Sequence, residues 1–275
     1  MPNDIGVHMA ELSGKVALVT GGGRGIGRAT AVELARAGAD VAVVARSATE
    51  VQAVAAEIAQ LAGQGAGRAV PLTIDLAERD APQKLIAKVE AELGPVAVLV
   101  NNAALAGPFG PTWEVEPDAW EQALHLNLTV PFRLIHAVLP QMQAAGWGRI
   151  INISSGAARN PLERAGAYSV SKAGLDMLTR QLGLELADTG IAVICVYPGV
   201  VDTTMQTTIR EQPQAIVGQA VAQRFQEFYT SGSLQAPERP ARLIAALATA
   251  AGAEFNGQIV DIYSEQGQQL VAAGG

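Results

Sequence analysis

Short apolar segments alternate with longer helical segments along almost the whole chain. In the short segments Val, Ile, Leu and Ala follow one another without the polar alternation of a half-exposed strand. This alternation predicts an α/β fold, a doubly wound parallel sheet with helices on both faces. Strands are expected at residues 15–20, 41–45, 68–74, 96–100, 149–153, 191–197 and 258–262. Helices are expected at about 25–37, 48–61, 80–93, 117–144 (split near Pro131), 166–187, 203–236 and 237–250.

The chain has the size and composition of one domain. Its 275 residues suit a single α/β domain, since such domains often reach about 250 residues before they split. With 49% hydrophobic and 16% charged residues, the composition predicts a large buried core and excludes a disordered chain. No repeat or low-complexity linker marks an internal boundary. We expect a single domain over 13–275 after a flexible leader over 1–12, which lacks the pattern of a signal peptide.

Several classes of protein are disfavoured by charge and composition. A net charge of −7 argues against sequence-independent binding of nucleic acid, which needs clustered positive charge. No apolar run is as long as the ~18 residues of a membrane helix. The single cysteine, Cys195, lies in an apolar strand, and the three histidines are too far apart to suggest a metal site. We expect a cytoplasmic protein without metal, membrane or nucleic-acid partners.

A glycine-rich turn, TGGGRGIG over 20–27, follows the first expected strand and opens the first helix. Glycines such as Gly21, Gly25 and Gly27 permit positive φ angles and the close approach of a pyrophosphate. The free N–H groups at the start of the helix can bind phosphate. Glycine strings also occur by chance, but this position between strand and helix favours dinucleotide binding over a plain turn.

The end of the second strand bears on which dinucleotide binds. A carboxylate there would accept a hydrogen bond from the ribose 2′-hydroxyl and repel a 2′-phosphate. The chain instead has Ala45 followed by Arg46, and Arg24 lies in the glycine turn. Each arginine alone is as consistent with a solvated surface residue. Together, and without an acid at position 45, they favour NADP(H) over NAD(H) because guanidinium binds phosphate bidentately.

Three polar residues have the spacing of an acid–base centre. Tyr168 and Lys172 are four apart in an expected helix and therefore lie on one face of it. A neighbouring ammonium is expected to lower the tyrosine pKa from about 10, so that the phenol can exchange a proton near neutral pH. Ser155 follows the fifth strand, whose carboxyl end lines the expected ligand crevice, and its hydroxyl could polarise a carbonyl. Its neighbour Ser154 is expected to be a structural hydrogen-bonding residue.

These motifs together resemble the classical short-chain dehydrogenases/reductases. The resemblance covers about residues 14–262 and rests on TGGGRGIG at 20–27, NNAA at 101–104, Asn127 in LNL, Ser155 in NISS, YSVSK at 168–172 and PGVVDT at 198–203. It implies a Rossmann-like sheet of seven parallel strands in the order 3-2-1-4-5-6-7. It also implies a catalytic tetrad in which Tyr168 donates the proton and Ser155 orients the carbonyl. Lys172 would bind the nicotinamide ribose, and Asn127 would hold a relay water.

The resemblance also implies cofactor contacts beyond the glycine turn. Asp75 and Leu76 would contact the adenine, and Asn102 and Ala103 would lie behind a ribose. The expected cofactor-binding set comprises Gly21, Arg24, Gly25, Ile26, Gly27, Arg46, Asp75, Leu76, Asn102, Ala103, Tyr168, Lys172, Pro198, Gly199, Val201 and Thr203. Ala104 departs from the family's usual glycine by one methyl group, and VDIYSEQ after the last strand weakens any close assignment to the ketoacyl-carrier-protein reductases.

The substrate itself is not specified by the sequence. Segments 104–116 and 156–167 and a lid at about 202–236 should shape its site, because long segments at such places commonly close over ligand. Their mixed side chains suggest a moderately apolar ketone or aldehyde. Phe225, Phe228 and Trp113 are equally consistent with ordinary core or subunit packing.

Three functions are compatible with these residues. The first is NADPH-dependent reduction of a carbonyl. The second is an NAD-dependent alcohol dehydrogenase of the same family, and the third is a non-catalytic NADP(H)-binding sensor or scaffold. The expected helices 117–144 and 166–187 resemble the dimer-forming pair with which the family commonly builds homotetramers, and we expect a homotetramer, with a homodimer as the alternative.

Overall fold

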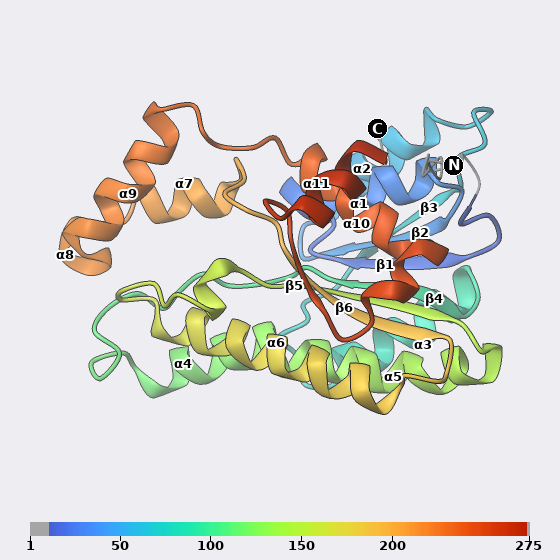
Figure 1. Ribbon diagram of the computed structural model, residues 1–275, viewed down its shortest axis with the longest axis horizontal. Helices are drawn as coiled ribbons and strands as arrows, with labels where there is room; N and C mark the ends of the chain where they lie inside the picture. The colour runs from blue at the N-terminus through green and yellow to red at the C-terminus, as the bar shows by residue number, and fades with distance from the viewer. Residues whose placement is uncertain (1–10, 274–275) are drawn as a thin grey trace.

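The computed structural model describes residues 11–273. Its seven strands form one parallel sheet in the order β3-β2-β1-β4-β5-β6-β7, as the resemblance implied (Figure 1). The strands are β1 (Val16–Thr20), β2 (Asp40–Ala45), β3 (Ala69–Thr73), β4 (Val96–Asn101), β5 (Gly148–Ile153), β6 (Ile191–Tyr197) and β7 (Ile259–Asp261). The expected strands are thus confirmed, with small changes at their ends.

Helices cover both faces of the sheet (Figure 1). One layer contains α1 (Gly25–Arg36), α2 (Ala48–Ala59), α10 (Glu238–Ala248) and α11 (Glu265–Ala273). The other contains α3 (Ala81–Glu92), α4 (Pro117–Leu124), α5 (Val130–Ala145) and α6 (Gly166–Glu185). Helix α11 was not expected from the sequence, because its nine residues, EQGQQLVAA, are too few to show a helical periodicity and include a glycine.

Both faces of the sheet are apolar because successive side chains of a strand point to opposite sides. Ala17 and Val19 pack under α1 and α10, whereas Leu18 between them packs against the α3 and α5 layer. Full burial of a Val or Leu side chain contributes about 1.5–3 kcal/mol to folding, relative to leaving that side chain exposed. Leu12, which the sequence analysis placed in the leader, is fully buried in the first of these clusters, and its N–H donates to the carbonyl of Ala37. The rest of that leader, residues 1–10, lies outside the described residues.

The long helix expected over 117–144 is divided by a π-helical segment, η1 (His125–Thr129). The split was expected near Pro131, but the irregular turn precedes that proline, which lies in the first turn of α5. A π-helical turn widens the helix by one residue and often occurs at functional sites. This turn carries Asn127, one of the four residues expected in the catalytic tetrad.

The segment expected to form a lid contains three short helices, α7 (Thr204–Arg210), α8 (Gln214–Val217) and α9 (Gln219–Thr230). These helices lie at the left of the view in Figure 1, apart from the other helices and above α4. Their apolar residues form a separate small cluster that also packs against Phe109 and Leu162. In the part of the chain that the structure describes, no helix is both long enough and apolar enough to cross a membrane.

Candidate active site

The fold brings the expected tetrad residues together beyond the carboxyl ends of the central strands. Ser155 lies two residues after β5, and its hydroxyl begins a short 3₁₀ turn by accepting a hydrogen bond from the N–H of Ala157, 3.2 Å away. Tyr168 and Lys172 lie in the first two turns of α6, with the lysine Nζ 5.7 Å from the centre of the tyrosine ring. The i, i+4 spacing thus places both side chains on one face, as expected.

Burial dominates the protonation of Tyr168. The phenol is in a desolvated environment that raises its pKa above the usual value, and a hydrogen bond with Ser155 opposes this effect. Lys172 was expected to lower the tyrosine pKa; this expectation is wrong, because burial raises it. The phenol therefore stays protonated at neutral pH.

Lys172 is almost completely buried. Desolvation lowers its pKa to about 8, whereas the nearby Cys195 and the carboxylate of Asp176 oppose that shift. The ammonium donates a hydrogen bond to the carbonyl oxygen of Ile153 at 2.6 Å. A lysine with a pKa near neutral pH can exchange a proton without a large energetic cost.

Asn127 holds the active-site loops together through its side chain. Its Oδ1 accepts from the N–H of Leu105 at 2.8 Å, and its Nδ2 donates to the carbonyl of the same residue at 2.9 Å. The Nδ2 also donates to the Ser171 hydroxyl at 3.0 Å. Asn127 therefore joins η1 to the segment after β4 and to the α6 turn that carries Lys172.

Behind Lys172 lies a buried polar cluster that the sequence analysis did not single out. The Asp176 carboxylate accepts hydrogen bonds from the Tyr197 hydroxyl and from the Cys195 thiol, the latter at 3.2 Å. Burial raises the pKa values of both the thiol and this phenol. Lys172 and Asp176 are four residues apart in a helix, and this spacing could have indicated that their side chains lie on one face. Cys195 was expected to be a buried strand residue, and it is. Ser154, also buried, donates to the carbonyl of Lys172 at 3.3 Å, which fits the structural role expected of it.

The glycine turn has the geometry that phosphate binding requires. Gly21 and Gly25 have φ angles of 63° and 53°. A Cβ on Gly27 would collide with the carbonyl oxygen of Gly21, so position 27 needs glycine for close packing. Helix α1 begins at Gly25 without a side-chain cap, which leaves its first N–H groups available to an anion.

Neighbouring strands hold this turn in place. The Asn102 amide donates to the carbonyls of Thr20 and Gly21 at 2.9 and 3.1 Å. The Thr20 hydroxyl accepts from the N–H groups of Asn102 and Ala103. On the far side, a Cβ on Gly25 would lie 3.1 Å from the methyl group of Thr203. The turn, the end of β4 and the segment after β6 thus meet beyond the carboxyl ends of the strands, where doubly wound folds bind dinucleotides.

The remaining expected cofactor residues lie near the ends of neighbouring strands or at the start of α1. Leu76 is buried after β3, and the carboxylate of Asp75 accepts from the N–H of Ala77. Ile26 is half-buried against the core. Pro198 and Val201 follow β6 and are buried, and Gly199 between them has a φ of 78°.

Both arginines expected at the adenosine end are exposed. Arg46 directly follows β2, and the turn contacts that strand through a hydrogen bond from the Gly22 N–H to the Val44 carbonyl. Arg24 forms an ion pair of 3.6 Å with Glu50, which the sequence analysis did not consider.

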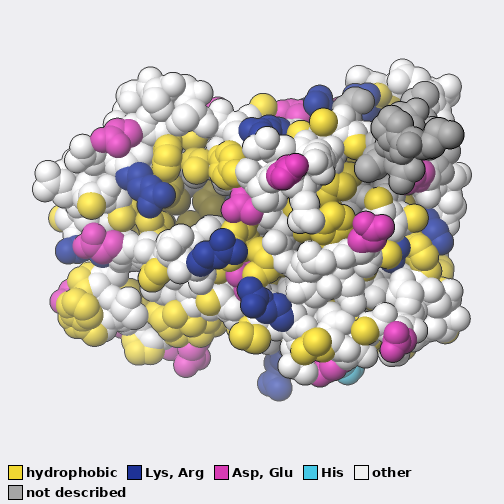
Figure 2. Space-filling view, viewed as in Figure 1, with side chains coloured by type: hydrophobic (Ala, Val, Ile, Leu, Met, Phe, Trp, Pro, Cys, Tyr) yellow, Lys and Arg dark blue, Asp and Glu magenta, His cyan; other side chains and the backbone are white. Residues whose placement is uncertain are grey.

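A hollow with largely hydrophobic walls lies between the lid helices and the rest of the molecule (Figure 2). Of the aromatic residues expected near the substrate, Phe225 is buried within the lid cluster and Trp113 is 85% exposed. The guanidinium of Arg164 donates to the Ala215 carbonyl at 2.9 Å and so connects segment 156–167 to α8.

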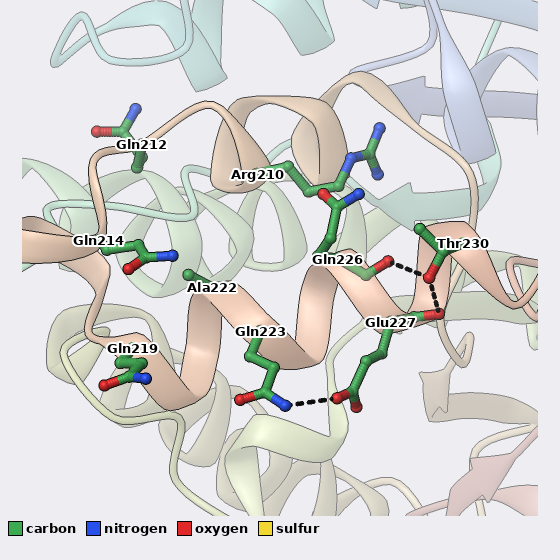
Figure 3. Close-up of a pocket in the computed structure, with 9 residues that line it drawn as sticks. All are labelled: Arg210, Gln212, Gln214, Gln219, Ala222, Gln223, Gln226, Glu227 and Thr230. Atoms are coloured by element: carbon green, nitrogen blue, oxygen red, sulfur yellow. Dashed lines mark hydrogen bonds between the residues drawn. The ribbon is translucent and has the colours of Figure 1, made fainter.

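A second pocket of about 390 Å³ lies within the lid and is mainly polar (Figure 3). Its lining comprises Arg210, Gln212, Gln214, Gln219, Ala222, Gln223, Gln226, Glu227 and Thr230. None of the tetrad residues contributes to it.

Comparison with known proteins gives the same family as the motifs. The family described as short chain dehydrogenase matches residues 15–214. The chain is 40% identical over 198 residues to short chain dehydrogenase MYCFIDRAFT_6125 of Pseudocercospora fijiensis; the match covers 71% of this chain and 62% of that relative. It is 35% identical over 254 residues to the 3-oxoacyl-[acyl-carrier-protein] reductase FabG of Pseudomonas aeruginosa, a match that covers 91% of this chain and 96% of the reductase.

A solved structure agrees with these relatives. The putative NAD(P)-dependent gluconate 5-dehydrogenase from Beutenbergia cavernae, with bound NADP at low occupancy, superposes with a TM-score of 0.79 and 33% identity. The superposition covers 91% of this chain and 96% of that one. The chain therefore belongs to the short-chain dehydrogenase/reductase family of oxidoreductases.

Proposed function

We propose that this protein reduces a small ketone or aldehyde to an alcohol with NADPH, and that Tyr168 donates the proton. The observation that carries the proposal is the pairing of the Tyr168 and Ser155 hydroxyls beside a buried, hydrogen-bonded lysine. The glycine turn and the uncapped start of α1 fit the pyrophosphate of a dinucleotide. When bound, the nicotinamide would supply the hydride.

Each tetrad residue has a distinct part in this mechanism. The raised pKa keeps Tyr168 protonated, as an acid must be before it donates to the carbonyl oxygen. Ser155 would hold and polarise the same oxygen. Lys172 would bind the nicotinamide ribose, and its positive charge would stabilise the phenolate that remains after proton transfer. Both N–H donors of Asn127 are already used, so a relay water at this residue would be held by its oxygen acceptors.

The test of this mechanism is Tyr168→Phe, assayed with a panel of ketones and aldehydes. Removal of the general acid should lower kcat by about 10²–10⁴-fold and should affect NADPH affinity far less. Tyr229→Phe is the matched control, because it removes a phenol from an exposed position of the lid and should preserve kcat. Near-normal turnover by the Tyr168 variant would contradict the mechanism.

A preference for NADP(H) is the second part of the proposal. It is supported by Arg24 and Arg46 at the adenosine end and by the absence of a carboxylate at position 45. Fluorescence titration with NADPH and NADH measures the preference directly. Arg46→Asp should move it toward NADH, because the new carboxylate would repel the 2′-phosphate. Tighter binding of NADH by the unmodified protein would instead favour the second candidate, an NAD-dependent alcohol dehydrogenase.

We also propose that the protein acts as a homotetramer or homodimer in the cytoplasm. Val170, Met177 and Leu184 are exposed at seven-residue intervals along α6, and Phe132 is exposed on α5. Such a row of apolar side chains favours burial against another copy of the helix pair. Light scattering on the purified protein tests this assembly.

A further inference from the structure

A carboxylate that the cofactor proposal does not use lies against the glycine turn. Glu50 belongs to the first turn of α2, and its Oε1 lies 3.6 Å from Nη1 of Arg24. A Cβ built on Gly23 would lie 2.9 Å from Oε2 of Glu50 and 3.3 Å from the Cβ of Ala45. The Glu50 carboxylate, the end of β2 and the turn therefore meet at one point.

The position of Glu50 is set by the start of its helix. The Ser47 hydroxyl caps α2 by accepting a hydrogen bond from the Glu50 N–H at 3.3 Å. A carboxylate in the first turn is further stabilised by the positive end of the helix dipole. Negative charge is thus a built-in feature of the place where the adenosine ribose of a bound dinucleotide would lie.

The ion pair has consequences for a 2′-phosphate. Arg24 is one of two cations expected to bind this group, and its guanidinium faces Glu50. A phosphate that approaches Arg24 must compete with the carboxylate for the guanidinium and is repelled by its charge. A 2′-hydroxyl carries no charge and meets neither cost. The same carboxylate can accept a hydrogen bond from that hydroxyl, as an acid at the end of β2 would.

We propose that Glu50 is a cofactor-specificity residue that weakens NADPH binding relative to NADH by competing for Arg24. This inference rests on the proposed function, in which Arg24 contacts the 2′-phosphate. Glu50 thereby supplies, from α2, the carboxylate that position 45 lacks. The chain holds an arginine and an acid at the same point, so its preference for NADPH is smaller than its arginines alone would give.

The experiment compares Glu50→Gln with Glu57→Gln. Glutamine keeps the size of the side chain and removes its charge. Glu57 lies on the same helix and forms a partly exposed ion pair with Arg28, held by two hydrogen bonds of 2.7 and 2.9 Å. Dissociation constants for NADPH, NADH and 2′,5′-ADP are measured by fluorescence or calorimetric titration at low and high salt.

We expect Glu50→Gln to tighten binding of NADPH and 2′,5′-ADP by about 3- to 20-fold. The substitution removes both the exposed Arg24–Glu50 ion pair and the repulsion between the carboxylate and the 2′-phosphate, and each effect changes affinity by a few-fold. Binding of NADH should stay unchanged or weaken. The gain should shrink at high salt, because exposed charges are screened. Glu57→Gln should change none of these constants by more than about twofold.

An unchanged or smaller ratio of NADPH to NADH affinity in Glu50→Gln would overturn the inference, because Glu50 would then be neutral or would orient Arg24 for the phosphate. Glu50→Ala provides a second variant with the same expected direction. The quantity to compare is the ratio of NADPH to NADH affinity in the wild-type protein and in each Glu50 variant. A wild-type protein that prefers NADH would contradict the proposed function, while the response to Glu50→Gln would still decide the inference.

Discussion

The Nζ of Lys172 donates a 2.6 Å hydrogen bond to the carbonyl oxygen of Ile153, the last residue of β5. This bond connects the helix that carries Tyr168 to the strand that leads into Ser155. The lysine is 3% exposed, and its neighbours on the buried side are Asp176 and Cys195. Its charge therefore depends on the protein interior and changes the stability of the fold.

The first prediction concerns the pH dependence of that stability. Burial lowers the Lys172 pKa from 10.5 to about 8, so between these pH values the unfolded chain binds more protons than the folded one. The free energy of unfolding contributed by this group therefore rises with pH across this window, by up to about 3 kcal/mol.

The measurement is urea denaturation of the wild-type protein and Lys172→Met at pH 7.5 and near pH 10. Titrating groups that the two proteins share cancel to first order when their free energies of unfolding are subtracted. The wild type should gain stability relative to the variant as the pH rises. A difference that does not change with pH would mean that Lys172 titrates near its usual pKa.

The second prediction concerns Asn127. Asn127→Ala removes three hydrogen bonds and leaves the main-chain groups of Leu105 and the Ser171 hydroxyl without this partner. Unsatisfied buried groups each cost about 1–3 kcal/mol, so we expect a total loss of roughly 2–5 kcal/mol in the free energy of unfolding. Asn160→Ala, at an exposed position, should cost less than about 0.5 kcal/mol. Equal denaturation midpoints for the two variants would contradict the structural role of Asn127.

The third prediction concerns the glycine turn. Gly27→Ala would drive a methyl group into the Gly21 carbonyl, so the turn must move. We expect the dissociation constant for NADPH to rise at least about tenfold, because the N–H groups of the turn and of the start of α1 must be held in position to bind the pyrophosphate. Gly156→Ala is the control, since its Cβ would meet no atom within 4 Å. Unchanged affinity in Gly27→Ala would place the pyrophosphate elsewhere.

The fourth prediction concerns the lid. Arg164 has a φ of 59°, rare for a residue other than glycine, and its guanidinium bonds to Ala215 at the start of α8. Arg164→Ala removes this connection, and we expect local opening of α7–α9 to become about 3- to 10-fold more frequent. Limited proteolysis should then cut the lid faster, whereas Arg180→Ala, at an exposed site on α6, should leave the rate unchanged. Equal rates would show that the apolar lid cluster alone holds these helices.

Local patterns in the sequence determined the alternation of strands and helices, the glycine turn after β1 and the common face of Tyr168 and Lys172. Each depends on residues within a few positions of one another, and periodicity reports such short-range relationships directly. The order of the strands followed from the resemblance of the motifs and was confirmed by the pairing in the sheet.

Only the tertiary structure decided the environment of these side chains. Tyr168 was expected to have a lowered pKa from the adjacent lysine, but burial raises it, and burial depends on segments far away in the sequence. The partners of Lys172 and Asn127, Ile153 and Leu105, lie 19 and 22 residues from them. The Arg24–Glu50 pair likewise forms because α2 packs beside the turn. Desolvation and charge–charge interactions act through space, so the sequence identified the chemical groups, whereas their charges and partners depend on the fold.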